Sequence, residues 1–136
     1  MSPLRCRATG ATSCSPAICA IASSTRSGAG WDGLRAACEG DFVIALYNPA
    51  SRARPAGVVE AFDLLRRLKT QATPVAFARA VGRADEQLTL TTLGAADASL
   101  ADMATLVVVG SSETRFIARD GGRPWMVTPR AYGARR

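Results

Sequence analysis

The side chains in this sequence that are best suited to bind a ligand are arginines near the ends of predicted strands. The chain has 17 Lys and Arg residues against 11 Asp and Glu, which gives a formal net charge of +6. The planar guanidinium group of arginine binds carboxylates through two parallel hydrogen bonds. We therefore take four arginines as candidates for binding an anionic ligand, with an ordinary solvated surface position as the alternative for each: Arg52, Arg79, Arg83 and Arg130.

The residue types that are missing exclude several kinds of chemistry. The sequence has no histidine, so it has no Ser-His-Asp triad, and most zinc sites are excluded as well. The four cysteines, Cys6, Cys14, Cys19 and Cys38, match neither paired zinc-ligand spacing nor a disulfide framework. We interpret them as reduced thiols in a cytoplasmic protein, and we predict no metal site and identify no catalytic side chain. No apolar run approaches the length of about 18 residues that a membrane span needs, so we expect no membrane association.

One apolar run ends in a turn where a ligand would be expected. Residues 41–47 (DFVIALY) are apolar at nearly every position, which is typical of a strand buried on both faces of a sheet. Pro49 and the preceding Asn48 end the strand. Ligands of open α/β sheets gather beyond the carboxyl ends of strands, so Tyr47 and Asn48 are candidates for ligand contact. The alternative is a simple strand–turn–helix connector.

The elements around this strand predict an α/β fold from residue 34 onward, with a mixed β-sheet flanked by helices. Residues 33–40 read as the end of a helix, and residues 55–69 as a second helix with one apolar stripe. Strands are expected at residues 73–81, 86–93 and 105–110, with a hairpin-like turn (GRAD) between the first two and a short helix at 98–103. We expect a tight turn at residues 120–122 and a core position for Trp125.

The first 33 residues differ from the rest in composition. Before Asp32 the segment has no acidic residue, and it shows no lasting period of a helix or a strand. We interpret residues 1–33 as an irregular segment, either disordered or read out of frame, and residues 34–136 as a C-terminal α/β domain.

Five sequence blocks in residues 34–132 resemble the tetrapyrrole methylase family: DFVIALYNPASRARP, TPVAFARAVGR, TLTTLGAAD, TLVVVGSSETR and MVTPRAY. They are similar to the C-terminal half of the precorrin-3B C(17)-methyltransferases of cobalamin biosynthesis. The resemblance implies a methyl transfer from S-adenosylmethionine (SAM) to C-17 of precorrin-3B, an anionic tetrapyrrole, with ring contraction to precorrin-4. It also implies a homodimer in the full-length family and no nucleic-acid partner. The alternative function is a non-catalytic basic module that binds nucleic acid or another polyanion.

The resemblance also implies a division of the SAM site between two halves. Family members carry a Gly-Gly-Asp-Pro loop in their first domain, and this sequence contains none, so the chain alone is expected to be inactive. Within the chain, the resemblance implies that three residue pairs face the cofactor: Tyr47–Asn48, Ala80–Val81 and Thr91–Thr92. Because each pair ends or follows a strand, we expect all three at one edge of the sheet, around a single cleft.

Overall fold

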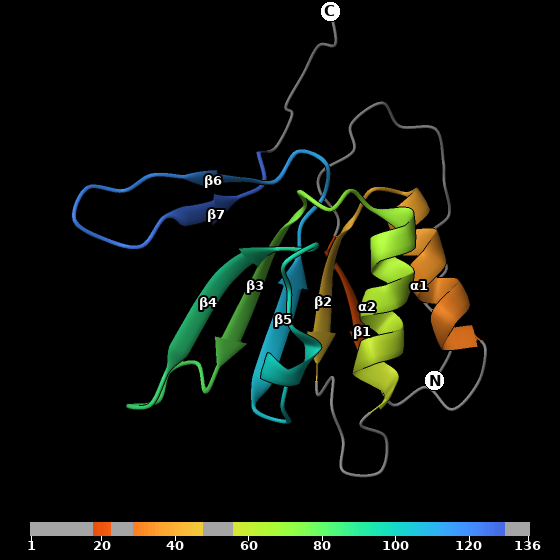
Figure 1. The fold of residues 1–136 in the computed structure, drawn as a ribbon, viewed down its shortest axis with the longest axis horizontal. Coiled ribbons are helices and arrows are strands. Elements are labelled where there is room, and N and C mark those ends of the chain that lie inside the picture. The colour runs from red at the N-terminus through yellow and green to blue at the C-terminus, as the bar shows by residue number, and fades with distance from the viewer. Residues whose placement is uncertain (1–17, 23–28, 48–55, 130–136) are drawn as a thin grey trace, which may run out of the picture.

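The computed structural model describes residues 18–22, 29–47 and 56–129. They form a five-stranded sheet of order β1-β2-β5-β3-β4, a separate two-stranded hairpin, and two α-helices (Figure 1). The expected α/β class with a mixed sheet is confirmed. The elements are β1 (Ile18–Ala22), α1 (Ala29–Glu39), β2 (Val43–Tyr47), α2 (Ala56–Leu68), β3 (Pro74–Arg79), β4 (Gln87–Thr92), the 3₁₀ helix η1 (Ala98–Leu100), β5 (Thr105–Val109), β6 (Arg115–Ile117) and β7 (Trp125–Val127).

Strand directions decide which loops share an edge of the sheet. β1 runs parallel to β2. β5 lies between β2 and β3 and is antiparallel to both, and β4 is antiparallel to β3. β2 and β3 therefore point the same way, and β4 and β5 point the opposite way.

The core lies between one face of this sheet and the two helices. Leu34 of α1 and Phe62 and Leu65 of α2 are at most 1% exposed and belong to the same cluster as Ile44 and Phe77 of the sheet. The ring of Phe62 stacks on that of Phe77, with centroids 5.9 Å apart. The apolar stripe predicted for the second helix is therefore the face that α2 turns toward the sheet.

The strand predicted at residues 41–47 is buried on both faces, as expected. Ile44 and Leu46 point toward the helices, and Val43 and Ala45 on the opposite face are 8% and 4% exposed. The strand begins two residues later than predicted, because Asp41 has a left-handed backbone with φ of 55° and cannot extend the strand.

Two features differ from expectation. Within the segment predicted to be irregular, Ile18–Ala22 forms strand β1, which extends the sheet beside β2. Trp125 was predicted to be in the core but is 57% exposed, because the β6–β7 hairpin projects away from the main sheet (Figure 1). Among the described helices, none is long and apolar enough to span a membrane.

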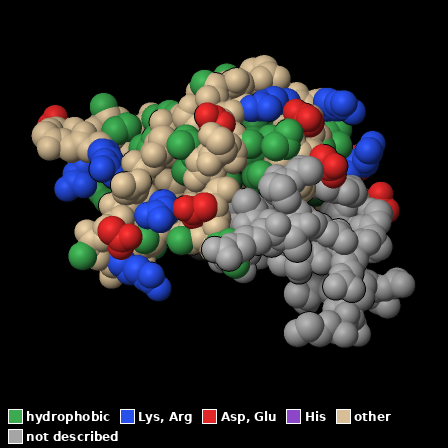
Figure 2. All heavy atoms as spheres, turned by 60° about the horizontal axis from the view of Figure 1, so that its bottom comes forward, with side chains coloured by type: hydrophobic (Ala, Val, Ile, Leu, Met, Phe, Trp, Pro, Cys, Tyr) green, Lys and Arg blue, Asp and Glu red, His purple; other side chains and the backbone are tan. Residues whose placement is uncertain are grey.

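Charged side chains of both signs are mixed on one face of the described residues (Figure 2). On the face shown in Figure 2, Lys and Arg side chains alternate with Asp and Glu side chains. That face therefore carries no extended patch of positive charge over its described residues.

Candidate functional site

The three residue pairs expected to share an edge lie at two opposite edges of the sheet. β2 and β3 end at the same edge, so the end of β2 at Tyr47 lies on the same side of the sheet as Ala80–Val81. Thr92, in contrast, pairs with Pro74 at the beginning of β3. The expectation of one common edge was wrong for Thr91–Thr92, because β3 and β4 form an antiparallel hairpin. We call the two edges the Val81 edge and the Thr92 edge.

The Val81 edge is shaped by an unusual backbone turn after β3. Ala80 has φ of 51° and Gly82 has φ of 80°, a region that side-chain-bearing residues adopt rarely. The Ala80 amide donates to the Ala104 carbonyl at 3.0 Å, and the Arg83 amide donates to the Ala80 carbonyl at 3.0 Å. The Gly82 amide donates to the Glu86 carboxylate at 2.8 Å. The turn is thus held by hydrogen bonds at both ends.

Arg79, a candidate for substrate binding, is paired with carboxylates of the chain itself. Its Nε donates to Asp102 Oδ2 at 2.8 Å, and its Nη1 lies 3.6 Å from Asp85 Oδ2. The hydrogen bond to Asp102 raises the pKa of the Arg79 guanidinium. Two neighbouring carboxylates largely neutralise this cation, so the structure favours a role for Arg79 within the chain.

Asp102 is a residue that the sequence analysis missed. Its Oδ1 accepts hydrogen bonds from the Ala104 amide at 2.9 Å and from Thr105 Oγ1 at 2.6 Å. The Thr105 hydroxyl first, and then Arg79, lower the pKa of the Asp102 carboxyl. An aspartate shortly before a predicted strand commonly accepts from the backbone amide two residues further on, and this pattern could have identified Asp102.

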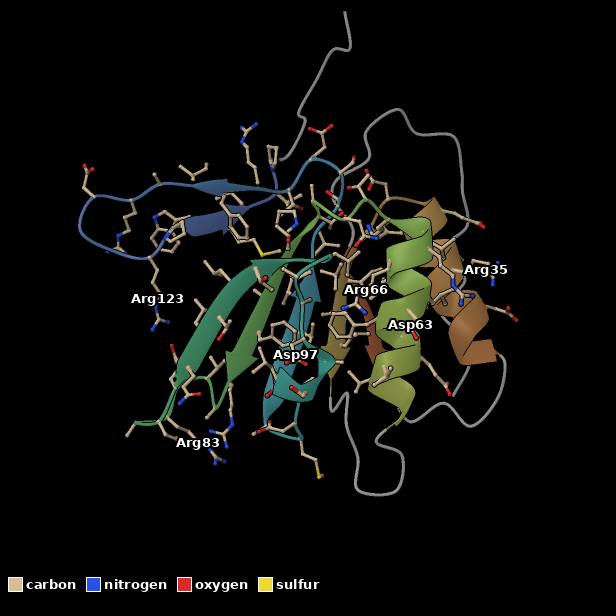
Figure 3. All side chains as sticks on the ribbon, in the orientation of Figure 1. Arg35, Asp63, Arg66, Arg83, Asp97 and Arg123 are labelled. Atoms are coloured by element: carbon tan, nitrogen blue, oxygen red, sulfur yellow. The ribbon has the colours of Figure 1, made fainter. Side chains whose placement is uncertain are left out.

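The other candidate arginines fall into two groups. Arg83 is exposed and lies in the β3–β4 turn, at one end of the sheet (Figure 3). Arg52 and Arg130 lie outside the described residues, as does Asn48. Only Arg79 and Arg83 can therefore be placed, and both belong to the Val81 edge.

The Val81 edge also exposes large apolar side chains. Val81 is 64% exposed, Met103 58% and Leu100 47%. Leu100 and Met103 lie just before β5, whose first residue pairs with Arg79. Exposed apolar groups beside backbone groups at strand ends suit a ligand that has both an apolar and a hydrogen-bonding part.

The Thr92 edge is occupied by contacts within the chain. Thr91 and Thr92 are half-buried, and the Thr92 carbonyl accepts from the Ala95 amide at 3.1 Å. The next residue, Leu93, donates its amide to the Thr73 carbonyl at 2.8 Å. The first bond closes a turn after β4 and the second links the end of β4 to the loop before β3, which is a structural arrangement.

The Ser111–Thr114 turn at the Thr92 edge is also a structural element. The Ser111 amide donates to Thr114 Oγ1 at 2.8 Å, and the hydroxyls of Thr114 and Thr128 lie 2.7 Å apart. A Cβ at Gly110 would lie 2.5 Å from Thr114 Cβ, so only glycine allows this close approach. The SSET motif therefore joins the β6–β7 hairpin to the end of β5.

The chain is similar to known proteins over most of its length. No family model matches the chain. The chain is 54% identical over 99 residues to a precorrin-3B C(17)-methyltransferase from Sinorhizobium sp. This match covers 73% of this chain and 39% of that protein. It is 46% identical over 97 residues to a probable cobalt-factor III C(17)-methyltransferase from Salmonella typhimurium, covering 71% of this chain and 38% of that protein.

The solved structures agree with the sequence comparison. The crystal structure of the methyltransferase CobJ matches with a TM-score of 0.73 and 36% identity, over 82% of this chain and 46% of that one. A cobalt precorrin-4 methyltransferase, CbiF, matches with a TM-score of 0.55 and 14% identity over 69% of this chain and 40% of that one, which supports the fold alone. The chain spans less than half the length of each of these proteins. Over about seven-tenths of its length, the chain is therefore similar to the C(17)-methyltransferases of cobalamin biosynthesis.

Proposed function

We propose that this chain forms the C-terminal part of a SAM-dependent methyltransferase that methylates precorrin-3B at C-17, with ring contraction to precorrin-4. The observation that carries the proposal is the 54% identity over 99 residues to a precorrin-3B C(17)-methyltransferase. Cobalt-factor III is the second substrate that the relatives' names suggest.

The chain's part in this reaction is to contribute one side of the cofactor site. Bound SAM would supply an electrophilic methyl group on a sulfonium: a nucleophilic ring carbon of the substrate would bond to that methyl carbon as the C–S bond breaks, and S-adenosylhomocysteine would leave as a neutral thioether. The protein then has to bind, orient and exclude water, which requires no nucleophile–base pair of its own. The backbone around Tyr47 and Ala80 and the exposed Val81 and Met103 side chains are the parts of the Val81 edge that would contact such a ligand.

We assign the cofactor to the Val81 edge, where the backbone turn and the exposed apolar side chains lie together. Tyr47–Asn48 and Ala80–Val81 are the proposed contact residues, and Arg83, Arg52 and Arg130 the proposed partners of substrate carboxylates. The family resemblance also suggested Thr91 and Thr92 as SAM contacts. Their place at the opposite edge favours a structural role, and the same experiment tests them.

A titration of the 15N-labelled chain with SAM, followed by NMR, tests the site directly. We expect amide shifts at Tyr47 and at residues 80–82, with weak affinity because the Gly-Gly-Asp-Pro side is missing. Residues 91–92 should not shift. Shifts at residues 91–92 without shifts at 80–82 would move the cofactor to the other edge, and no shifts at all would contradict a SAM site on this chain.

A second experiment tests the activity. The chain is joined in frame to the N-terminal part of the Sinorhizobium relative, and methyl transfer from SAM to precorrin-3B is measured. Asn48→Ala should weaken SAM binding in this fusion, and Thr92→Val serves as the matched control that should not. Equal SAM affinity in Asn48→Ala and the parent would remove Asn48 from the site.

The remaining expectations are separate proposals. Homodimerisation is suggested by the family resemblance, and sedimentation of the fusion measures it. A cytoplasmic location is suggested by the cysteine pattern, and fractionation of the source cells measures it.

A further inference from the structure

The backbone at Ala80 has a conformation that its own side chain does not favour. Its φ of 51° lies in the left-handed region, where L residues other than Asn and Asp are uncommon. Such a conformation persists only where the surrounding contacts enforce it. The contacts that hold Ala80 therefore also shape the proposed cofactor site.

The contacts come from the strand next to β3. The Ala80 amide donates to the Ala104 carbonyl at 3.0 Å, which continues the β3–β5 ladder one step beyond Arg79. Residue 104 is in turn fixed by Asp102, whose Oδ1 accepts from the Ala104 amide at 2.9 Å. The position of Ala80 therefore depends on the conformation of the segment from residue 102 to residue 104.

Asp102 connects this segment to β3 through its second oxygen. Oδ2 accepts from Arg79 Nε at 2.8 Å, while Oδ1 also accepts from Thr105 Oγ1 at 2.6 Å. Thr105 is 3% exposed and pairs with Arg79 in the ladder. One carboxylate thus joins the last residue of β3 to the first residue of β5, directly before the turn that carries Ala80 and Val81.

Arg79 serves this purpose through its Nε, which donates to Asp102 Oδ2 at 2.8 Å. Its guanidinium already contacts Asp102 and lies 3.6 Å from Asp85. A substrate carboxylate that took the Nε donor would break the hydrogen bond to Asp102. That would release the backbone that the cofactor is proposed to contact.

We infer that Arg79 and Asp102 are positioning residues, which hold the Ala80–Val81 backbone in the shape that the cofactor site requires. The inference rests on the proposed function, because it assumes that SAM lies at the Val81 edge. Without the pair, the turn has several conformations in the free chain, and binding has to order it. Ordering one residue's backbone corresponds to about a tenfold loss of affinity.

The test is the NMR titration of the 136-residue chain with SAM, applied to four variants. Asp102→Ala and Arg79→Ala should each raise the Kd for SAM about tenfold, whereas Arg79→Lys, which keeps the charge, should largely restore the affinity. Asp85→Ala is the matched control: its carboxylate is on the same turn, lies 3.6 Å from Arg79 and accepts no hydrogen bond from it. Its Kd should stay within about twofold of wild type.

A purely structural pair would give a different pattern. In that case Asp102→Ala and Arg79→Ala would lower the urea midpoint and leave the Kd for SAM unchanged, which would overturn the inference. If Asp102→Ala does not fold, the Kd values of Arg79→Ala and Arg79→Lys for SAM are compared instead. Equal Kd values in these two variants and wild type would overturn the inference. No SAM-induced shifts in the wild-type chain would overturn the proposed site and this inference with it, whereas wild-type binding with equal affinity in the variants would overturn the inference alone.

Discussion

Single carboxylates decide much of the local structure in this chain, and Asp102 is the clearest example. It accepts hydrogen bonds from a backbone amide, a buried hydroxyl and a guanidinium. All three stabilise the ionised form, so the pKa of Asp102 in the folded chain is below its ordinary value of 3.8. The unfolded chain therefore takes up this proton first as the pH falls.

This difference predicts an acid-dependent loss of stability at Asp102. The contribution is fully present above the ordinary pKa of 3.8, and it is lost as the pH falls through the lower folded-state value. Urea unfolding between about pH 2 and pH 6 should therefore show a smaller acid dependence in Asp102→Asn than in wild type. Asp120→Asn, in the exposed hairpin loop, is the control. Identical pH profiles in wild type and Asp102→Asn would contradict the expectation.

Pairs of elements are held together by buried polar contacts as well as by the core. Lys69, just after α2, is 5% exposed at its side chain. Its Nζ donates to the Phe42 carbonyl at 3.3 Å and to the Gly110 carbonyl at 3.0 Å, and it lies 3.8 Å from Asp41 Oδ1. Asp41 also accepts hydrogen bonds from the amide and the hydroxyl of Ser112. The end of α2, the beginning of β2 and the end of β5 are thus joined at one point.

Removing that ammonium should therefore destabilise the whole domain. Lys69→Met keeps most of the aliphatic volume but leaves two carbonyls without their donor, which should lower the free energy of unfolding by about 2–3 kcal/mol. Arg67→Met, on the exposed side of the same helix, is the control and should change it by less than about 0.5 kcal/mol. Equal stabilities of the two variants in urea unfolding would show that water replaces the Lys69 contacts.

At the level of elements, the sequence was sufficient where local patterns determine the outcome. The apolar run of β2 and the stripe of α2 predicted both elements and their burial, because period and burial are local properties. The Gly-Arg-Ala-Asp link predicted a hairpin, and a hairpin places the end of its second strand beside the start of its first. A hairpin is incompatible with an edge shared by Thr91–Thr92 and Ala80–Val81, so the sequence already indicated that these two pairs lie at opposite edges.

Other features depend on contacts between distant residues and were not predictable. The pair of Arg79 with Asp102 exists only because β5 lies next to β3, although β4 follows β3 in the sequence. The exposure of Trp125 depends on the direction in which the β6–β7 hairpin leaves the sheet, which its apolar neighbours Met126 and Val127 do not indicate. Strand β1 is a short apolar stretch in a polar segment. It is a strand because it pairs with β2, and this pairing cannot be read from the segment itself.

At the level of the whole molecule, the charge distribution bears on the alternative of a polyanion-binding module. Positive and negative side chains are mixed on the face in Figure 2, and Arg66 and Arg79 are both paired with aspartates. A nucleic-acid interface needs an excess of unpaired cations along one surface. The net charge of +6 therefore gives this alternative no support on that face.

The absence of a Gly-Gly-Asp-Pro string from the sequence leads to a prediction for the whole chain. The purified 136-residue chain should not methylate precorrin-3B, because its sequence contains no Gly-Gly-Asp-Pro loop. The measurement is transfer of a labelled methyl group, with the in-frame fusion to the Sinorhizobium N-terminal part as the positive control. Transfer by the chain alone, at a rate comparable to the fusion, would mean that the loop is dispensable.

The projecting hairpin has a consequence for how the folding of this chain can be followed. Its Trp125 indole is 57% exposed, with the Arg119 guanidinium carbon 5.0 Å from the ring centroid. In a Trp31→Phe background, tryptophan fluorescence would come from this solvated indole alone. Its emission maximum would therefore shift little on denaturation, while far-UV circular dichroism would record the loss of α2 and the main sheet. A fluorescence melt read alone would describe the hairpin and miss the unfolding of the domain.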